Sequence, residues 1–157
     1  MDKSTAQDQS PVISVVVPLL NEQDNLAELY LQITNALHHG PAYEIIFIDD
    51  GSTDNSLKIL RDLHEKDTHV RIIRFRKNFG QTAAMSAGFS HARGEIIIPL
   101  DADLQNDPAD IPRMVDKLNE GYDVVSGWRK KRHDHAMTRL LPSRIANWII
   151  ARTTGVG

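Results

Sequence analysis

EIIIPLDADLQ, residues 95–105, carries a short apolar run rich in isoleucine straight into two aspartates. Runs of this composition, separated by helical patterns, predict buried strands. Asp101 and Asp103 stand two residues apart, so strand alternation directs both side chains the same way. Two carboxylates held this close repel each other, and a divalent cation with oxygen ligands relieves the repulsion. The pair predicts a metal site with Gln105 as a neutral ligand; the alternative is a pair of solvated turn acids.

The rest of the chain repeats this strand-then-helix order, which is the signature of the α/β class. Short continuous apolar strands are usually covered on both faces, so we expect one mainly parallel sheet with helices on both sides. Its 157 residues are enough for one ordinary core. The other strands are expected at 12–17 (ended by Pro18), 44–48, 70–75 and 124–128. The helices are expected around 26–37, 57–63, 81–92 (rich in small residues) and 108–118.

Polar clusters follow each expected strand. In parallel sheets ligands bind beyond the carboxyl ends of the strands. That edge receives Asn21-Glu22, Asp49-Asp50, Asn78-Phe79-Gly80, residues 101–105 and Arg129. The sequence therefore places one binding site at this edge.

Asp49-Asp50-Gly51 begins the second cluster. A carboxylate here can accept the imide N–H of uracil, or the N1–H and amino group of guanine, and we favour this base contact for Asp50. The alternative is that Asp49 and Asp50 accept loop amides while Ser52 or Asp54 caps the next helix. For Asp54 we favour the cap.

Composition narrows the class of protein. The chain has no cysteine, which excludes disulfides and thiolate metal sites. Residues 1–10 are polar and are expected to form a flexible N-terminus without a secretory signal. No apolar run approaches the roughly 20 residues that span a bilayer, so we expect only peripheral membrane contact and a start in the cytosol.

The C-terminal segment 129–157 is basic at its start, although the whole chain has a net charge of −3. Residues 129–144 contain six basic side chains and one acidic one, which predicts an anionic partner such as phosphate or a lipid surface. Leu141, Ile145, Trp148 and Ile149 then follow helical spacing. We expect an amphipathic interfacial helix, or alternatively a helix that packs on the domain.

The ordered series of motifs resembles family 2 glycosyltransferases of the polyprenyl-phosphate type, typified by dolichyl-phosphate mannosyltransferase and bacterial undecaprenyl-phosphate sugar transferases. The motifs that carry the resemblance are Pro18-Leu19-Leu20-Asn21-Glu22, Ile48-Asp49-Asp50-Gly51-Ser52, Asn78-Phe79-Gly80, residues 101–105, 121–125 and 129–132. The resemblance implies a single GT-A, Rossmann-like domain over residues 11–128.

The resemblance also assigns roles to residues. It implies a nucleotide pocket lined by Pro18, Leu20, Glu22, Ile48, Asp50, Asp101, Ala102 and Asp103. It implies that Asp103 and Gln105, with Asp101, hold Mg²⁺ or Mn²⁺. Asp101, Asp103 and Arg129 are the expected catalytic residues, and Arg129 and Arg132 the expected ligands of an acceptor phosphate.

The implied reaction moves a sugar from a UDP- or GDP-sugar to a polyprenyl phosphate at the cytoplasmic face of the membrane, with inversion. The acceptor phosphate is already an anion, so no protein base is needed. Relatives continue past Gly157, so we expect an N-terminal fragment. A nucleotide-binding fragment without transferase activity and a transferase with a hydroxyl acceptor stay open as alternatives.

Other classes fit less well. A phosphatase of the haloacid dehalogenase type needs Asp-x-Asp-Gly-Thr, and here Leu104-Gln105 follows Asp103. No Gly-x-Gly-x-x-Gly follows the first strand, which argues against a dinucleotide-binding module. We expect no nucleic-acid partner, and a homo-oligomer is possible.

Overall fold

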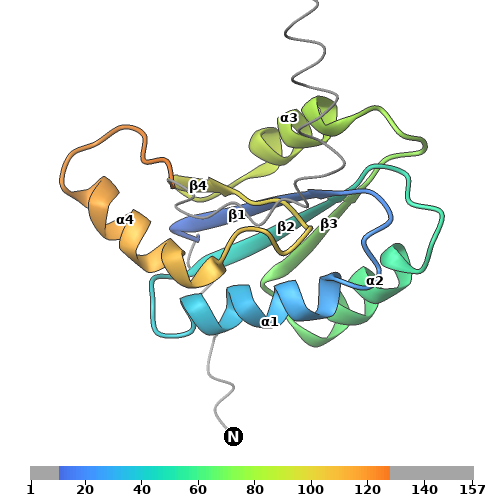
Figure 1. Ribbon diagram of the computed structural model, residues 1–157, viewed down its shortest axis with the longest axis horizontal. Coiled ribbons are helices and arrows are strands. Elements are labelled where there is room, and N and C mark those ends of the chain that lie inside the picture. The colour runs from blue at the N-terminus through green and yellow to red at the C-terminus, as the bar shows by residue number, and fades with distance from the viewer. Residues whose placement is uncertain (1–10, 128–157) are drawn as a thin grey trace, which may run out of the picture. The chain divides into compact units, whose positions relative to one another are not determined.

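The computed structural model describes residues 11–127, and a first compact unit ends at Val125. Four strands and four α-helices alternate along this unit (Figure 1). The strands are β1 (Ile13–Leu19), β2 (Tyr43–Asp49), β3 (Val70–Arg74) and β4 (Ile96–Pro99). The helices are α1 (Leu26–Leu37), α2 (Ser56–Lys66), α3 (Gln81–His91) and α4 (Ile111–Asn119), with a 3₁₀ turn, η1 (Pro108–Asp110), before α4. The predicted α/β order is confirmed over these residues.

All pairings within the described sheet are parallel, in the order β3-β2-β1-β4. The chain therefore adds β2 and β3 on one side of β1 and then crosses to add β4 on the other. Such a reversal opens a crevice at the carboxyl ends of the two strands where the direction of winding changes, here β1 and β4.

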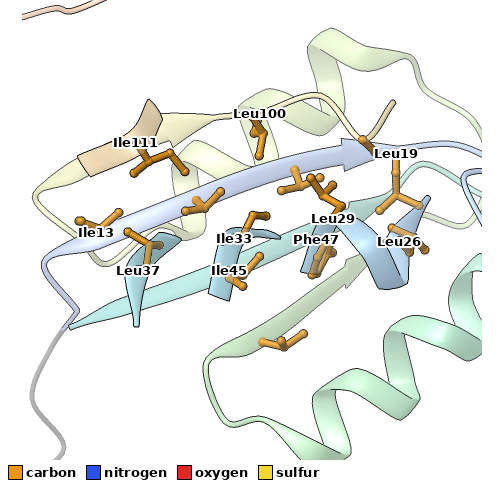
Figure 2. Close-up of a cluster of buried hydrophobic side chains, with 14 of the residues drawn as sticks. Ile13, Leu19, Leu26, Leu29, Ile33, Leu37, Ile45, Phe47, Leu100 and Ile111 are labelled. Atoms are coloured by element: carbon orange, nitrogen blue, oxygen red, sulfur yellow. The ribbon is translucent and has the colours of Figure 1, made fainter. Parts of the chain in front are cut away.

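One face of the sheet is covered by α1, α2 and α4 (Figure 1). Helical spacing places four apolar side chains of α1 against it, and all are buried: Leu26, Leu29, Ile33 and Leu37. Figure 2 shows this row lying against side chains of β1 and β2, among them Ile45 and Phe47. Burying these side chains is the main source of stability for this layer.

The opposite face is covered by α3, which packs very closely on β1 and β2 (Figure 1). A Cβ added to Gly88 would lie 2.3 Å from Cγ1 of Val16, so only glycine fits this contact. Ala84 is also fully buried there. The prediction of a helix with small residues packed closely on the sheet is confirmed.

Two prolines lie inside strands, and the ladder explains why both are tolerated. We expected Pro18 to end β1, but β1 continues to Leu19. On the β4 side the pairing of β1 stops at Val16 with Pro99. Leu100 N donates to Val16 O, so the backbone polar groups of Val16 point toward β4. Backbone polar groups alternate in direction along a strand, so the N–H that Pro18 lacks would also point to the β4 side, where β1 has no further partner in the described sheet. By the same alternation the N–H that Pro99 lacks would point away from β1, to the outer edge of β4, where no ladder bond of the described sheet is lost.

The predicted strand at 124–128 is wrong over its described residues, because Val124 to Gly127 form no strand. The side chain of Val124 is 81% exposed. A β-branched pair favours extended backbone but makes a strand only when a neighbour binds its amides and covers its side chains. Position 128 lies outside the described residues.

A buried ionic network closes the amino-terminal end of the sheet. Glu44 is 4% exposed and accepts hydrogen bonds from Ser14 Oγ at 2.7 Å and from the Arg93 amide at 2.7 Å. Arg71 Nη1 lies 2.7 Å from the second carboxylate oxygen. Burial raises the pKa of Glu44, but these hydrogen bonds and the Arg71 charge outweigh it, so the net pKa is lowered.

Glu44→Gln is expected to lower the free energy of unfolding at neutral pH by about 2 kcal/mol, because it leaves a partly buried guanidinium without its counter-charge. A folded pKa below the unfolded one means that Glu44 stabilises the fold above pH 4.5 and that this stability is lost as the pH falls through the folded pKa. Urea unfolding at several pH values should therefore show the two proteins converging in acid. Glu65→Gln, an exposed site on α2, is the matched control and should leave stability unchanged.

Candidate nucleotide-sugar site

A cavity of about 370 Å³ opens at the carboxyl edge of the sheet. Cavities of this size suit a small molecule. Its walls come from the end of β1 and from the segments that follow the four strands: Pro18, Leu19, Leu20 and Glu22; Asp50; Asn78, Gly80, Gln81 and Ala84; Asp101, Ala102 and Asp103. The crevice expected between β1 and β4 is thus present, and three aspartates face it.

The loops after β1 and β2 are bonded to each other along their length. Asn21, with a left-handed φ of 57°, donates its amide to Ser52 Oγ at 2.9 Å and accepts the Thr53 amide at 2.8 Å. The Glu22 amide donates to Ser56 Oγ at 3.0 Å. These reciprocal bonds hold Glu22 and Leu20 at the rim before any ligand arrives.

Asp54 joins the same pair of loops. Its carboxylate accepts the amide of Ser56, the first residue of α2, and the amide of Gln23. Burial raises the pKa of Asp54, but the hydrogen bonds from Ser56 and from the Gln23 amide outweigh it and lower the net pKa. Asp54 therefore bonds the first amide of α2, as its interpretation as a cap implied, although the N-cap position itself is Asn55.

Asp50 lines the cavity and anchors the loop between β3 and α3. Its two carboxylate oxygens accept the amides of Phe79 at 2.7 Å and Gly80 at 2.8 Å. Gly51, with a left-handed φ of 81°, makes the close approach possible, because a Cβ there would lie 2.7 Å from the backbone of Lys77. Each oxygen of Asp50 keeps a second lone pair for a ligand.

Asp49 has a different role from its neighbour. It is fully buried, does not line the cavity, and accepts the Ser52 amide at 2.8 Å. Its other oxygen has no hydrogen-bond partner in the part of the chain that the structure describes, and Arg74 Nε lies 4.0 Å away. Asp49 therefore shapes the loop from beneath.

The acidic loop after β4 holds its two carboxylates over a buried Ala102. Asp101 and Asp103 are both exposed on the cavity wall. Asp103 Oδ1 accepts the Gln105 amide at 3.0 Å, within a turn in which Leu104 has a φ of 58°. Asp101 Oδ1 instead accepts Gln81 Nε2 at 3.1 Å, from the first turn of α3.

The carboxylate oxygens of Asp101 and Asp103 are suitable ligands for a hard divalent cation. Carboxylate oxygens are the ligands that Mg²⁺ and Mn²⁺ prefer. Among residues 11–127 no group of three His, Cys, Asp or Glu side chains gathers into a metal site. Two carboxylates at an open wall suit an ion that completes its shell with ligand oxygens and water.

Comparison with known proteins identifies the family. A family model described as glycosyl transferase family 2 matches residues 14–155. The chain belongs to glycosyl transferase family 2.

Named relatives within this family share much of the sequence. The undecaprenyl-phosphate 4-deoxy-4-formamido-L-arabinose transferases of Salmonella paratyphi B and Salmonella typhimurium are each 47% identical over 152 residues. The match covers 94% of this family 2 chain but 46% of those proteins, so the chain spans less than half the length of these curated relatives.

Solved structures support the fold. TarS 1–349 of S. aureus, solved in complex with UDP, is 20% identical, matches 81% of this chain and 39% of its own, and superposes with a TM-score of 0.58. The predicted GT-A fold is confirmed by this similarity, which at such identity speaks for the fold alone.

The structure brings most residues predicted for the family 2 site to one cavity. Pro18, Leu20, Glu22, Asp50 and the segment 101–103 all line it. Ile48 does not: it is fully buried beneath α3. Gln105 does not line the cavity either, although its amide bonds to Asp103.

The predicted roles of Arg129 and Arg132 are not tested, because both residues lie outside the described residues. The expected interfacial helix lies outside them as well. Conversely, Gln81 and Ala84 line the cavity without having been predicted. Both belong to α3, and a helical pattern alone does not reveal which of its first-turn residues face a neighbouring loop.

Proposed function

We propose that this family 2 chain binds the donor in a metal-dependent, inverting transfer of a sugar from a UDP- or GDP-sugar to a polyprenyl phosphate. The observation that carries the proposal is the cavity at the β1/β4 crevice, where Asp50, Asp101 and Asp103 converge. An acidic pocket repels a bare diphosphate, so a cation has to accompany such a ligand.

The nucleoside end of the donor belongs beside Asp50, Pro18 and Leu20. Pro18 and Leu20 offer apolar wall to a base, and Leu20 is 38% exposed. The spare lone pairs of Asp50 can accept an imide N–H of uracil or the paired donors of guanine. Because two loop amides already hold the Asp50 carboxylate, it needs no rearrangement to do so.

The diphosphate end belongs beside the acidic loop. Asp103 and Asp101, which line the cavity, would hold Mg²⁺ or Mn²⁺; the Gln105 side chain, predicted as a further oxygen ligand, does not line it. When bound, the ion stabilises the negative charge that develops on the departing diphosphate. Asp103 is held for this task by the amide of its own turn.

The acceptor phosphate attacks the anomeric carbon from the face opposite the leaving group, which inverts that centre. Its oxygen is an anion at neutral pH, so the chain has no proton to remove. We assign Arg129 to the leaving group and to the acceptor phosphate, and Arg132 to the acceptor phosphate, on their charge and motif; charge-assisted bonds of arginine to phosphate are strong and directional.

We propose undecaprenyl phosphate as the acceptor and the cytoplasmic face of the membrane as the location. The support is the name of the relatives at 47% identity, which are undecaprenyl-phosphate transferases. Over residues 11–127, no helix combines the length and the apolar character that crossing a bilayer requires. Contact with the lipid surface is assigned to the basic segment from residue 129.

Isothermal titration of the chain with UDP and with GDP, each with and without Mn²⁺, tests the donor site. One of the two nucleotides should bind more tightly when Mn²⁺ is present, because the ion offsets the repulsion between the diphosphate and the acidic wall. Absence of binding by both nucleotides in the presence of Mn²⁺ would overturn the proposal. A second assay then tests the acceptor, with radiolabelled sugars linked to whichever nucleotide binds. Transfer of the label to undecaprenyl phosphate, and not to a short alcohol, would support a lipid-phosphate acceptor over a hydroxyl acceptor.

A further inference from the structure

Asp101 and Asp103 are held by different parts of the fold, although they belong to one loop. Asp103 bonds to the amide of its own turn. Asp101 Oδ1 is held from another element, by the side-chain amide of Gln81 at 3.1 Å. Because Gln81 is exposed and lines the cavity, this contact lies at the ligand and not in the core.

Gln81 is itself well anchored. It opens α3, and the residue before it, Gly80, donates its amide to Asp50 Oδ2 at 2.8 Å. A short series of bonds therefore joins Asp50, on the nucleoside side of the cavity, to Asp101, on the diphosphate side.

The chemistry of the Gln81 side chain suits the contact. A neutral amide donates a hydrogen bond to a carboxylate without adding charge, so it leaves the attraction of the loop for a cation in place. Because Oδ1 of Asp101 accepts this bond, the orientation of the carboxylate is restricted, and Asp101 can offer Oδ2 and the second lone pair of Oδ1 to an incoming ligand. An acidic side chain at position 81 would instead add a further negative charge to the cavity wall and lose the donor.

We propose that Gln81 is a positioning residue of the donor site, which orients Asp101 for the complex of metal ion and nucleotide. The inference rests on the proposed function. Partners that orient metal-site groups from outside the ligand shell typically change affinity by about 10-fold to 100-fold when removed. Gln81 should influence binding of the nucleotide with Mn²⁺ and leave binding without Mn²⁺ nearly unchanged.

The test is a titration of the chain and its variants with Mn²⁺ plus whichever of UDP or GDP the wild type binds. Gln81→Leu, which removes the amide at similar size, should weaken binding about tenfold. Thr82→Ala, at the next and likewise exposed position of α3, is the matched control and should bind like the wild type. Circular dichroism should show the same melting temperature for all three proteins.

Gln81→Glu separates hydrogen bonding from shape. At about pH 7.5 its carboxylate cannot donate, so this variant should bind at least as weakly as Gln81→Leu.

Two different failures can be told apart. If the wild type binds neither nucleotide with Mn²⁺, the proposed function falls and the role of Gln81 falls with it. If the wild type binds and Gln81→Leu binds equally well, only the role of Gln81 is overturned. Binding of Gln81→Glu at wild-type strength at about pH 7.5 would also overturn it, because it would show that the shape of the side chain and not its donated hydrogen bond matters.

Discussion

Asp103→Ala is expected to weaken Mn²⁺-dependent nucleotide binding by at least about 100-fold. Removing a group that merely orients a metal ligand costs about 10-fold to 100-fold in affinity, and Asp103 is proposed as a ligand itself. Its side chain is exposed on the cavity wall, and the contact it makes is to the amide of Gln105 in its own turn. The fold should therefore survive the change, and calorimetric titration with Mn²⁺ and nucleotide can measure the loss.

Asp116→Ala is the matched control for Asp103→Ala. It removes the same charge from an exposed position on α4 that does not line the cavity. The control should bind Mn²⁺ and nucleotide as the wild type does. Equal affinity of Asp103→Ala and the wild type would remove Asp103 from the metal site and with it the main support for a metal-dependent reaction.

Gly51→Ala is expected to lower the free energy of unfolding by about 3 kcal/mol. Its φ of 81° is costly for any residue with a Cβ, by about 1–2 kcal/mol. The added carbon would also lie 2.7 Å from the backbone of Lys77 and 2.9 Å from that of Asn78, neither of which can rotate away. The loop before α3 has to move outward to relieve this contact. Inserting extra atoms into a well-packed region typically costs about 1–3 kcal/mol of stability.

Gly121→Ala isolates the backbone component of the Gly51 effect. Gly121 also has a positive φ, 105°, but nothing lies within 4 Å of the position of its Cβ. Urea denaturation should show a loss of about 1 kcal/mol for this variant. If the two glycine variants lose the same stability, the close approach of Gly51 to the loop is not what that glycine provides.

The fold was largely predictable because its strands are short, apolar and followed by polar clusters. The run before Asp101 and the run before Asp49 are strands in the structure, as predicted. The errors arose where tertiary context decides. Pro18 stays within β1 because the ladder toward β4 has already stopped, and Val124 forms no strand because a strand needs a partner, which local propensity does not supply.

The site was predictable to the level of its loops but not of its hydrogen bonds. Parallel strands bring their carboxyl ends together, so Asp50 and the acidic loop could be expected at one edge. The amides that bind Asp50 belong to residues 29 and 30 positions away, and pattern does not reveal such partners. Gln81 escaped prediction for the same reason, since Asp101 is 20 residues distant in the chain.

Strand β2 connects two regions with different tasks. Glu44 is the second residue of β2, and Asp50 comes directly after its last residue, Asp49. At the usual rise of a strand the two are separated by about 20 Å. Changes that far apart generally have additive energetic effects. Substitutions around the cavity can therefore accumulate without loss of the stability that the Glu44 network provides near neutral pH.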